Sequence, residues 1–388
     1  MTRPFSLFPT LLLWLALLFS SLLHGQPAVS GTVRDSLTGE PVSFATVYFD
    51  GTTVGTTTDD AGAYRLPLSD MKLPAVVVAT HLNYRSANRL VERGGEQDPL
   101  VLAPSAYEIA AVEVGDRNNR ERNLREFREA FLGTDPGGRR ATLTNQERLR
   151  FDRTYRTDTL RHADVLVERH GLPDDLRNVQ WSIDGKSLTF EQASDLRVSS
   201  AGVLRVDVPD LGYRVSVDLI QFSIDYRAGS TFGLGTYYFE PYEGNGKARG
   251  RHVRNRRETY YLSSQHFLRA LYADNLAAEG FAVYEMVDDE ARPIDLTAFL
   301  RRVSDTEMAI EGLNGRRIAV LYYHDRRGRP LPPDRRKRAA YTTSYLTVLG
   351  PSATFRADGT LGNSPISFGG TMGAFQVTRM LPSDYRPE

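Results

Sequence analysis

The chain has 388 residues, of which 41% are hydrophobic and 25% charged, a composition typical of globular proteins with two or three domains. Lys and Arg together number 48, as do Asp and Glu, so the total charge does not favour nucleic acid or another polyanion as a general partner. The absence of cysteine excludes disulfides, thiolate metal sites, a cysteine nucleophile and a lipid-modified cysteine.

Residues 1–25 have the pattern of a secretory signal peptide. Arg3 supplies a short basic segment, residues 11–19 are all apolar, and small residues precede Gln26. The alternative is an uncleaved anchor, because residues 4–23 carry no charge and are almost long enough to span a bilayer. No later segment is apolar enough for a transmembrane helix. We therefore expect a cleaved secretory signal and a secreted protein.

Residues 26–104 are predicted to form an all-β sandwich. Ala45, Val47 and Phe49 alternate with polar or amphipathic residues, which predicts a strand with one buried and one solvated face. The segments 38–41 and 60–62 have turn chemistry, and β-rich runs follow at 75–80, 88–91 and 100–103. Residues 109–114 are compatible with one further strand.

The residue order of this region resembles the carboxypeptidase regulatory-like domain. The resemblance is carried by Gly31-x-Val33-x-Asp35, Thr38-Gly39-Glu40-Pro41-Val42, Ala45-x-Val47, Gly55-Thr56-x-Thr58-Asp59 and Gly62-x-Tyr64. It implies a small transthyretin-like sandwich that accompanies other domains and has no catalytic residues of its own.

Residues 105–139 are predicted to form a linker of strand and helix. Leu124, Phe127 and Phe131 recur at helical spacing, which predicts a helix over residues 119–132. Gly133 is a suitable C-terminal stop, and Pro136 prevents continuation.

Residues 140–388 are predicted to form an α+β domain with a mostly antiparallel sheet. Residues 139–196 indicate mixed strand and loop, and residues 202–242 indicate strands whose apolar phase changes near Leu219 and Ile220, which predicts a β-bulge. A second helix is predicted from a cap at Ser263 or Ser264 to Gly280. Strands are expected at 317–323, 341–349, 353–356 and 373–377.

Essentially the whole chain after the signal peptide resembles envelope proteins of the Bacteroidetes that join a carboxypeptidase regulatory-like domain to a family-specific C-terminal region. The resemblance is carried by Asn255-Arg256-Arg257-x-x-Tyr260-Tyr261-x-Ser263-Ser264-x-His266-Phe267-Leu268-Arg269-x-Leu271, by Arg125-Glu126-Phe127-x-x-x-Phe131-Leu132-Gly133, and by Gly369-Gly370-x-Met372-Gly373 with Leu381-Pro382-Ser383-Asp384-Tyr385. It implies secretion across the inner membrane, a location in the periplasm or at the outer membrane, this domain order, and no catalytic residue. Residues 153–197 are longer and more charged than the resemblance leads us to expect.

The sequence lacks the motifs of the common hydrolases. No His lies three residues before a Glu or pairs with another His at helical spacing, so a zinc peptidase site is not predicted, and no serine lies in a Gly-x-Ser-x-Gly frame. We therefore predict no enzyme activity and no catalytic, cofactor-binding or metal-binding residues. The leading hypothesis is a non-catalytic envelope protein with a binding or assembly role. The alternatives are an envelope hydrolase with dispersed catalytic residues, and an outer-membrane β-barrel or transporter-associated component.

Two basic runs are the candidate binding segments. Residues 247–257 contain six Lys or Arg and residues 326–338 contain seven, and both are expected to be exposed loops. Their positive charge would suit an anionic envelope component or an acidic envelope protein. The predicted contacts are Arg254, Arg256, Arg257, Arg335, Arg336 and Arg338.

Overall fold

The computed structural model describes residues 27–69, 71–105, 117–172, 176–242, 244, 246–288, 290–362, 366–373 and 376–388. The predicted signal peptide and the predicted strand at 109–114 lie outside these residues. The fold is mostly β, its sheets are mainly antiparallel, as predicted, and the buried hydrophobic side chains of the described residues form three clusters. One cluster lies wholly within residues 140–388, the region predicted as one α+β domain, and a second lies mostly there but also includes Phe127, Phe131 and Leu132. Among the described residues, no helix has both the length and the apolar character needed to cross a bilayer.

The first unit consists of two four-stranded sheets packed around Val29, Val47, Phe49 and Leu66. One sheet contains β1 (Ala28–Asp35), β4 (Ala63–Pro67), β7 (Gly95–Glu96) and β8 (Leu100–Leu102), and the other contains β2 (Thr46–Phe49), β3 (Gly55–Thr57), β5 (Ala75–Thr80) and β6 (Ala87–Val91). The prediction that one face of β2 is exposed to solvent is wrong at Tyr48. This residue is buried because a later part of the chain, which contains Thr236, covers it.

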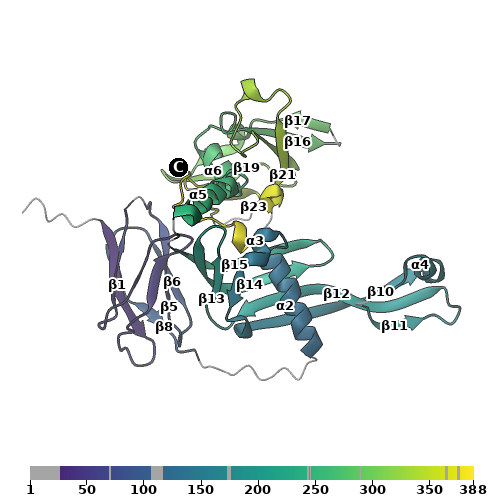
Figure 1. Cartoon of the computed structure of the whole chain (residues 1–388), viewed down its shortest axis with the longest axis horizontal. Helices are drawn as coiled ribbons and strands as arrows, with labels where there is room; N and C mark the ends of the chain where they lie inside the picture. The colour runs from purple at the N-terminus through teal and green to yellow at the C-terminus, as the bar shows by residue number, and fades with distance from the viewer. Residues whose placement is uncertain are drawn as a thin grey trace, which may run out of the picture.

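The second unit is a seven-stranded sheet with one helix across it (Figure 1). α2 (Arg117–Leu132) agrees with the predicted helix, and its Phe127 and Phe131 pack edge-on against Phe222. Gly133 follows the helix with φ of +95°, a backbone conformation that favours glycine and ends the helix, as predicted. The unit contains α3 (Pro136–Arg140), β9 (Thr142–Thr144), β10 (Leu149–Arg161), α4 (Ala163–His170), β11 (Arg177–Trp181), β12 (Ser187–Ser200), β13 (Leu204–Val208), β14 (Tyr213–Asp225) and β15 (Ser230–Pro241).

The predicted β-bulge is present in β14. Leu219 pairs with Gly235 and Gln221 with Leu234, so Ile220 is the extra residue. Leu219 and Phe222 are both buried, whereas Ile220 is 54% exposed. The change of apolar phase in the sequence is therefore the signature of the bulge, and Ile220 itself does not join the core.

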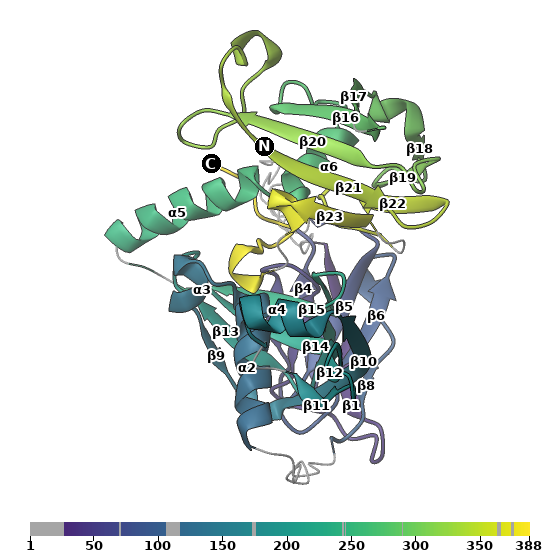
Figure 2. The same cartoon turned by 90° about the vertical axis from the view of Figure 1, so that its right-hand side faces the viewer.

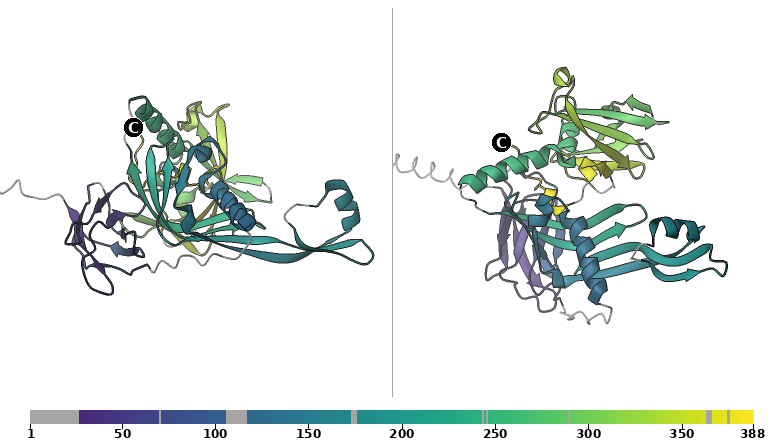
Figure 3. Two further views of the ribbon diagram at one scale, coloured as in Figure 1. Left: turned by 60° about the horizontal axis from the view of Figure 1, so that its bottom comes forward. Right: turned by 45° about the vertical axis from the view of Figure 1, so that its right-hand side comes forward.

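Residues 149–200 form a long arm. β10 pairs with β12 from Leu149 and Ser200 to Arg161 and Ser187, and α4 and β11 lie at the far end. Figures 1 and 3 show this ribbon projecting well beyond the rest of the sheet. The sequence led us to expect mixed strand and loop in this region. The structure instead has a nearly continuous two-stranded ribbon.

The third unit contains two sheets and two helices. The sheet orders are β17-β16-β20-β21-β23 and β18-β19-β22. Ser263 caps α6 by accepting the amide of His266, as predicted, but α6 ends at Tyr272 and not near Gly280. The elements are α5 (Gly246–Tyr261), α6 (Ser264–Tyr272), β16 (Phe281–Val287), β17 (Glu290–Pro293), β18 (Leu300–Arg302), β19 (Glu307–Glu311), β20 (Ile318–His324), β21 (Ala340–Val348), β22 (Ser352–Arg356) and β23 (Ile366–Gly370). Of the strand expected at 373–377, residues 374 and 375 lie outside the described residues, and Gly373 and Val377 belong to short 3-10 turns; β23 lies just before this segment.

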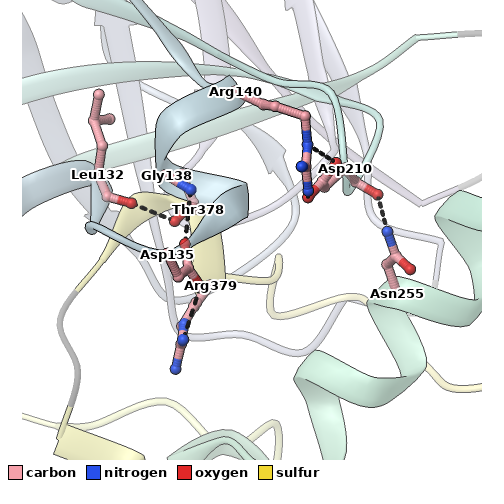
Figure 4. Close-up of polar contacts among 8 residues, drawn as sticks. All are labelled: Leu132, Asp135, Gly138, Arg140, Asp210, Asn255, Thr378 and Arg379. Atoms are coloured by element: carbon pink, nitrogen blue, oxygen red, sulfur yellow. Dashed lines mark hydrogen bonds and ion pairs between the residues drawn. The ribbon is translucent and has the colours of Figure 1, made fainter.

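The C-terminal segment, residues 376–388, touches all three units. The Thr378 hydroxyl donates to the Leu132 carbonyl at the end of α2, and Arg379 pairs with Asp135 (Figure 4). The Ser383 amide donates to Gly51 of the first unit, and Arg269 of α6 donates to the carbonyl oxygens of Ser383 and Tyr385.

Candidate binding surfaces

The first basic run is helical. Residues 247–257 were expected to be a loop, but they form most of α5, which links the second and third units (Figure 2). Only His252 and Tyr260 of α5 are fully buried, and these two residues lie eight positions apart on one face. The helix therefore packs along a narrow polar and aromatic stripe, and an apolar periodicity is absent from its sequence.

The inner face of α5 is held by the turn between β13 and β14. Arg256 donates to the carbonyl oxygens of Leu211 (2.6 Å) and Gly212 (3.0 Å), and its guanidinium carbon lies 3.9 Å from the ring centroid of Tyr213. Asn255 donates to the Asp210 carbonyl, and the Asp210 carboxylate pairs with Arg140 of α3 (Figure 4). The Arg256 side chain thus has a structural role, although it is one of the predicted contacts.

The outer face of α5 carries free positive charge. Lys247, Arg251 and Arg254 are spaced at i, i+4 and i+7, so they share one side of the helix. All three are exposed, and none forms an ion pair with a residue that the structure describes. This stripe lies opposite the face that contains Arg256 and Tyr260, and its cations point away from the body of the protein.

The second basic run lies in the connection between β20 and β21. Arg336 donates to the carbonyl oxygens of Leu331 (3.1 Å) and Phe281 (3.2 Å) and lies over the ring of Tyr323. Arg336 is half-buried, and this burial lowers the pKa of its guanidinium. Arg335 and Arg338 are exposed, and Arg335 lies 3.9 Å from Asp334.

Both runs influence the charge of Tyr261. Burial raises the pKa of the Tyr261 hydroxyl, and the charges of Arg257 from the first run and Arg329 from the second both oppose that rise. Arg257 is half-buried, and its Nε has no hydrogen-bond partner in the described part of the chain. The six predicted arginines therefore divide into exposed Arg254, Arg335 and Arg338, half-buried Arg257, and the structural Arg256 and Arg336.

A second surface lies on the arm and was not predicted from the sequence. A groove of about 220 Å³ lies between α4 and the ribbon and is lined by Leu160, Leu166, Leu172, Leu188 and neighbouring residues. Beyond it, Trp181 is 44% exposed and Ile183 fully exposed. The apolar side chains lie among charged residues without a regular period, so hydrophobic patterning gives no signal for this surface.

The structure also shows the surroundings of His266, the histidine placed on a predicted helix. His266 is buried, its Nε2 lies 2.9 Å from Glu279 Oε2, and its ring contacts Phe281 and Tyr322. The hydrogen bond to His266 lowers the pKa of Glu279. The other ring nitrogen, Nδ1, lies 3.3 Å from the Tyr261 carbonyl oxygen, so both nitrogens of His266 are engaged and the pair has the geometry of a buried structural contact.

Larger ionisable groupings do not change this interpretation. Within the described ranges, no group of three or more His, Asp or Glu is arranged to hold a metal ion. A groove of about 570 Å³ lies along α2 and the segment that follows it, with Arg125, Arg128 and Arg139 in its lining, and His266 is not one of its lining residues. Neither the His266–Glu279 pair nor this groove brings a candidate acid or base together with a nucleophile.

Comparison with known proteins places only the first unit. A search of curated proteins finds no match to the chain. Residues 28–115, which are 88 of the 388 residues, match the family model of the carboxypeptidase regulatory-like domain. The match covers the sandwich and extends past its last strand, β8, and the domain is non-catalytic. The first unit of this protein is therefore similar to the carboxypeptidase regulatory-like domain, as the sequence motifs predicted.

Proposed function

We propose that this protein is a non-catalytic, secreted protein of the cell envelope, periplasmic or outer-membrane associated, that binds an anionic envelope component through α5. The observation that carries the proposal is the stripe of Lys247, Arg251 and Arg254. A carboxypeptidase regulatory-like domain at the N-terminus, and the resemblance of the remaining chain to Bacteroidetes envelope proteins, support the location.

The charge of the stripe suits binding and does little for the fold. Three exposed cations on one helix face repel one another, and they have no described acidic partner to offset this repulsion. Near an anionic membrane surface each Lys or Arg contributes about 1 kcal/mol of attraction. The total charge is neutral, so we expect no general attraction of the whole protein to an anionic surface, and binding should depend on local basic patches.

Vesicle sedimentation tests this proposal. Anionic and neutral lipid vesicles are mixed with the native chain and with the Lys247→Gln, Arg251→Gln, Arg254→Gln variant. We expect the native chain to bind anionic vesicles at low salt and the variant to bind at least about tenfold more weakly. Binding should also weaken at physiological salt, where the screening length is about 8 Å.

The matched control removes the same charge elsewhere. Arg93, Arg205 and Arg227 are exposed and lie on separate strands and turns, and replacing these three by Gln gives the same change of net charge. The control variant should bind as the native chain does. Equal weakening of both variants would show that only net charge matters, and no binding by the native chain would refute the proposal.

The arm favours a second candidate function, which is assembly with another envelope protein. Ile183 and Trp181 lie at the end of a projecting ribbon, where they stabilise no core, and exposed apolar side chains beside a groove are typical of protein contact sites. Photo-crosslinking residues placed at Ile183 and Val165 in cells should give a discrete adduct. The same residue at Leu37, which is 80% exposed in the first unit, is the control. Equal labelling at Leu37, or none on the arm, would exclude this function.

A further inference from the structure

The first unit docks on the second through backbone bonds. The amide of Gly51, in the turn between β2 and β3, donates to the Tyr237 carbonyl (2.7 Å), and the Phe239 amide donates to the Thr52 carbonyl (3.0 Å). Figure 1 shows the first unit lying beside the sheet that contains β13, β14 and β15. These two bonds exist only while the units are docked, so their amides report on the junction directly.

Side chains close the same junction tightly. The ring of Tyr48 stacks on Tyr238 with centroids 5.0 Å apart, and its hydroxyl lies 3.0 Å from that of Thr236. A Cβ added to Gly55 would lie 2.5 Å from the Tyr238 ring. The two units therefore meet without space for even one additional methyl group.

A carboxyl group lies inside this contact. Asp50 is largely withdrawn from water and accepts the Tyr237 amide at 2.8 Å. The ionisable groups that act on Asp50 or on its neighbour Tyr48 come from three strands: Tyr48 itself from β2, Tyr237 from β15 and Asp218 from β14. The Tyr237 hydroxyl is buried without a hydrogen-bond partner among the described residues.

No positive charge balances these groups. Asp218 accepts a hydrogen bond from Ser86 of the first unit, and Asp384 of the C-terminal segment binds Thr53 next to the turn. Neither of these carboxylates, nor Asp50, forms an ion pair with a cation in the described part of the chain. Docking therefore transfers the Asp50 carboxylate into an environment that disfavours its negative charge.

We propose that this junction is an acid-tightened latch, in which protonation of Asp50 strengthens the docking of the regulatory-like unit on β14 and β15. The latch is independent of the surface through which the protein binds. It would hold the first unit most firmly in an acidic medium and release it most readily at neutral pH.

The direction follows from proton linkage. Burial raises the pKa of Asp50 to about 6, and the amides of Tyr237 and Gly51 offset only part of the rise. Burial also raises the pKa of Asp218. A carboxyl group that holds its proton more tightly in the docked state favours docking as the pH falls through 6 towards its ordinary value of 3.8. Asp50 alone should tighten docking about tenfold between about pH 7.5 and about pH 5.

Amide hydrogen exchange of the full chain measures this change. The protection factors of the Gly51 and Phe239 amides, corrected for intrinsic exchange, should rise about tenfold over that interval. The Val42 amide, which bonds to Val33 within the first unit, is the internal control. Protection at Gly51 and Phe239 that is flat, or that changes only in parallel with Val42, would overturn the proposal from the native chain alone.

Two variants distinguish the effect of Asp50 ionisation from the effect of weakening the docking contact itself. Asp50→Asn keeps an oxygen acceptor and cannot ionise, so protection should stay near its acidic value at both pH values. Gly55→Val should lower protection at both pH values, because the added side chain meets Tyr238. A full native pH response in folded Asp50→Asn protein would exclude Asp50 as the sensor.

Discussion

The guanidinium of Arg256 covers the ring of Tyr213, with 3.9 Å between the guanidinium carbon and the ring centroid. It thereby joins α5 to β14 at the point where the second unit passes into the third. Arg254, two residues earlier, faces solvent.

These two arginines should differ in their effect on stability. Arg256→Gln loses the cation–π contact and two hydrogen bonds to carbonyl oxygens, which we expect to lower the free energy of unfolding by about 2 kcal/mol. Arg254→Gln should change it by less than about 0.5 kcal/mol. Urea denaturation of both variants measures the difference, and equal midpoints would show that Arg256 contributes only charge.

Glu126 of α2 should make the protein sensitive to acid. Burial opposes its ionisation, but hydrogen bonds from Tyr226, Arg153 and Arg122 outweigh burial and lower its pKa below 4.5. Because the folded-state pKa is depressed, this stabilisation is present above about pH 4.5 and is lost as the pH falls through the folded value.

The corresponding variant is Glu126→Gln. It leaves the buried guanidinium of Arg153 without its anionic partner, and we expect a loss of about 3 kcal/mol at neutral pH. The loss should shrink as the pH falls below about 4.5, because the native protein then progressively loses the stabilisation that ionised Glu126 provides. Denaturation midpoints measured at neutral pH and near pH 3 check the sign, and a loss that is constant with pH would contradict it.

Gly62 should not tolerate a side chain. Its φ is +70°, and a Cβ would lie 2.6 Å from the Val33 carbonyl oxygen, so Gly62→Val combines backbone strain with a clash against β1. We expect a loss of at least about 2 kcal/mol. Ala61→Val, at the exposed neighbouring position, should be nearly neutral. Thermal unfolding of the two variants makes the comparison, and similar melting temperatures would argue against it.

The first unit should fold when it is separated from the rest. Residues 27–105 contain both sheets and a complete cluster of buried side chains. The fragment should nevertheless be less stable than the same unit in the full chain, because Tyr48 loses its cover by Tyr238. Circular dichroism and chemical denaturation test both statements, and a disordered fragment would show that docking is required for folding.

The sequence predicts elements that pack by a regular hydrophobic pattern. Helix α2 and the bulge in β14 were both predicted because Phe127, Phe131 and Phe222 belong to apolar sets with a definite period. α5 was missed because its inner face uses His252 and Arg256, which carry no hydrophobic signal.

The arm and the junction were missed for other physical reasons. A two-stranded ribbon is held mainly by backbone pairing, and beyond the base of the arm β10 has no fully buried residue and β12 has only Leu188, so the hydrophobic pattern of both strands is weak. The burial of Tyr48 depends on β15. Thr236 of that strand, whose hydroxyl meets the Tyr48 hydroxyl, has a sequence separation of 188 from Tyr48. A local pattern does not contain such a contact.

The C-terminal segment joins residues that lie very far apart in the sequence. The Thr378 hydroxyl bonds to a residue 246 positions earlier, and Asp384 bonds to Thr53 at a separation of 331. Contacts of such separation close very large loops, whose entropic cost must be met before the contacts stabilise anything. Each unit can gather its own core from nearer residues, so we expect the bonds made by residues 376–388 to form after those cores. Until the units have docked, we expect Tyr48 and the edge of β15 to be open to association with other chains.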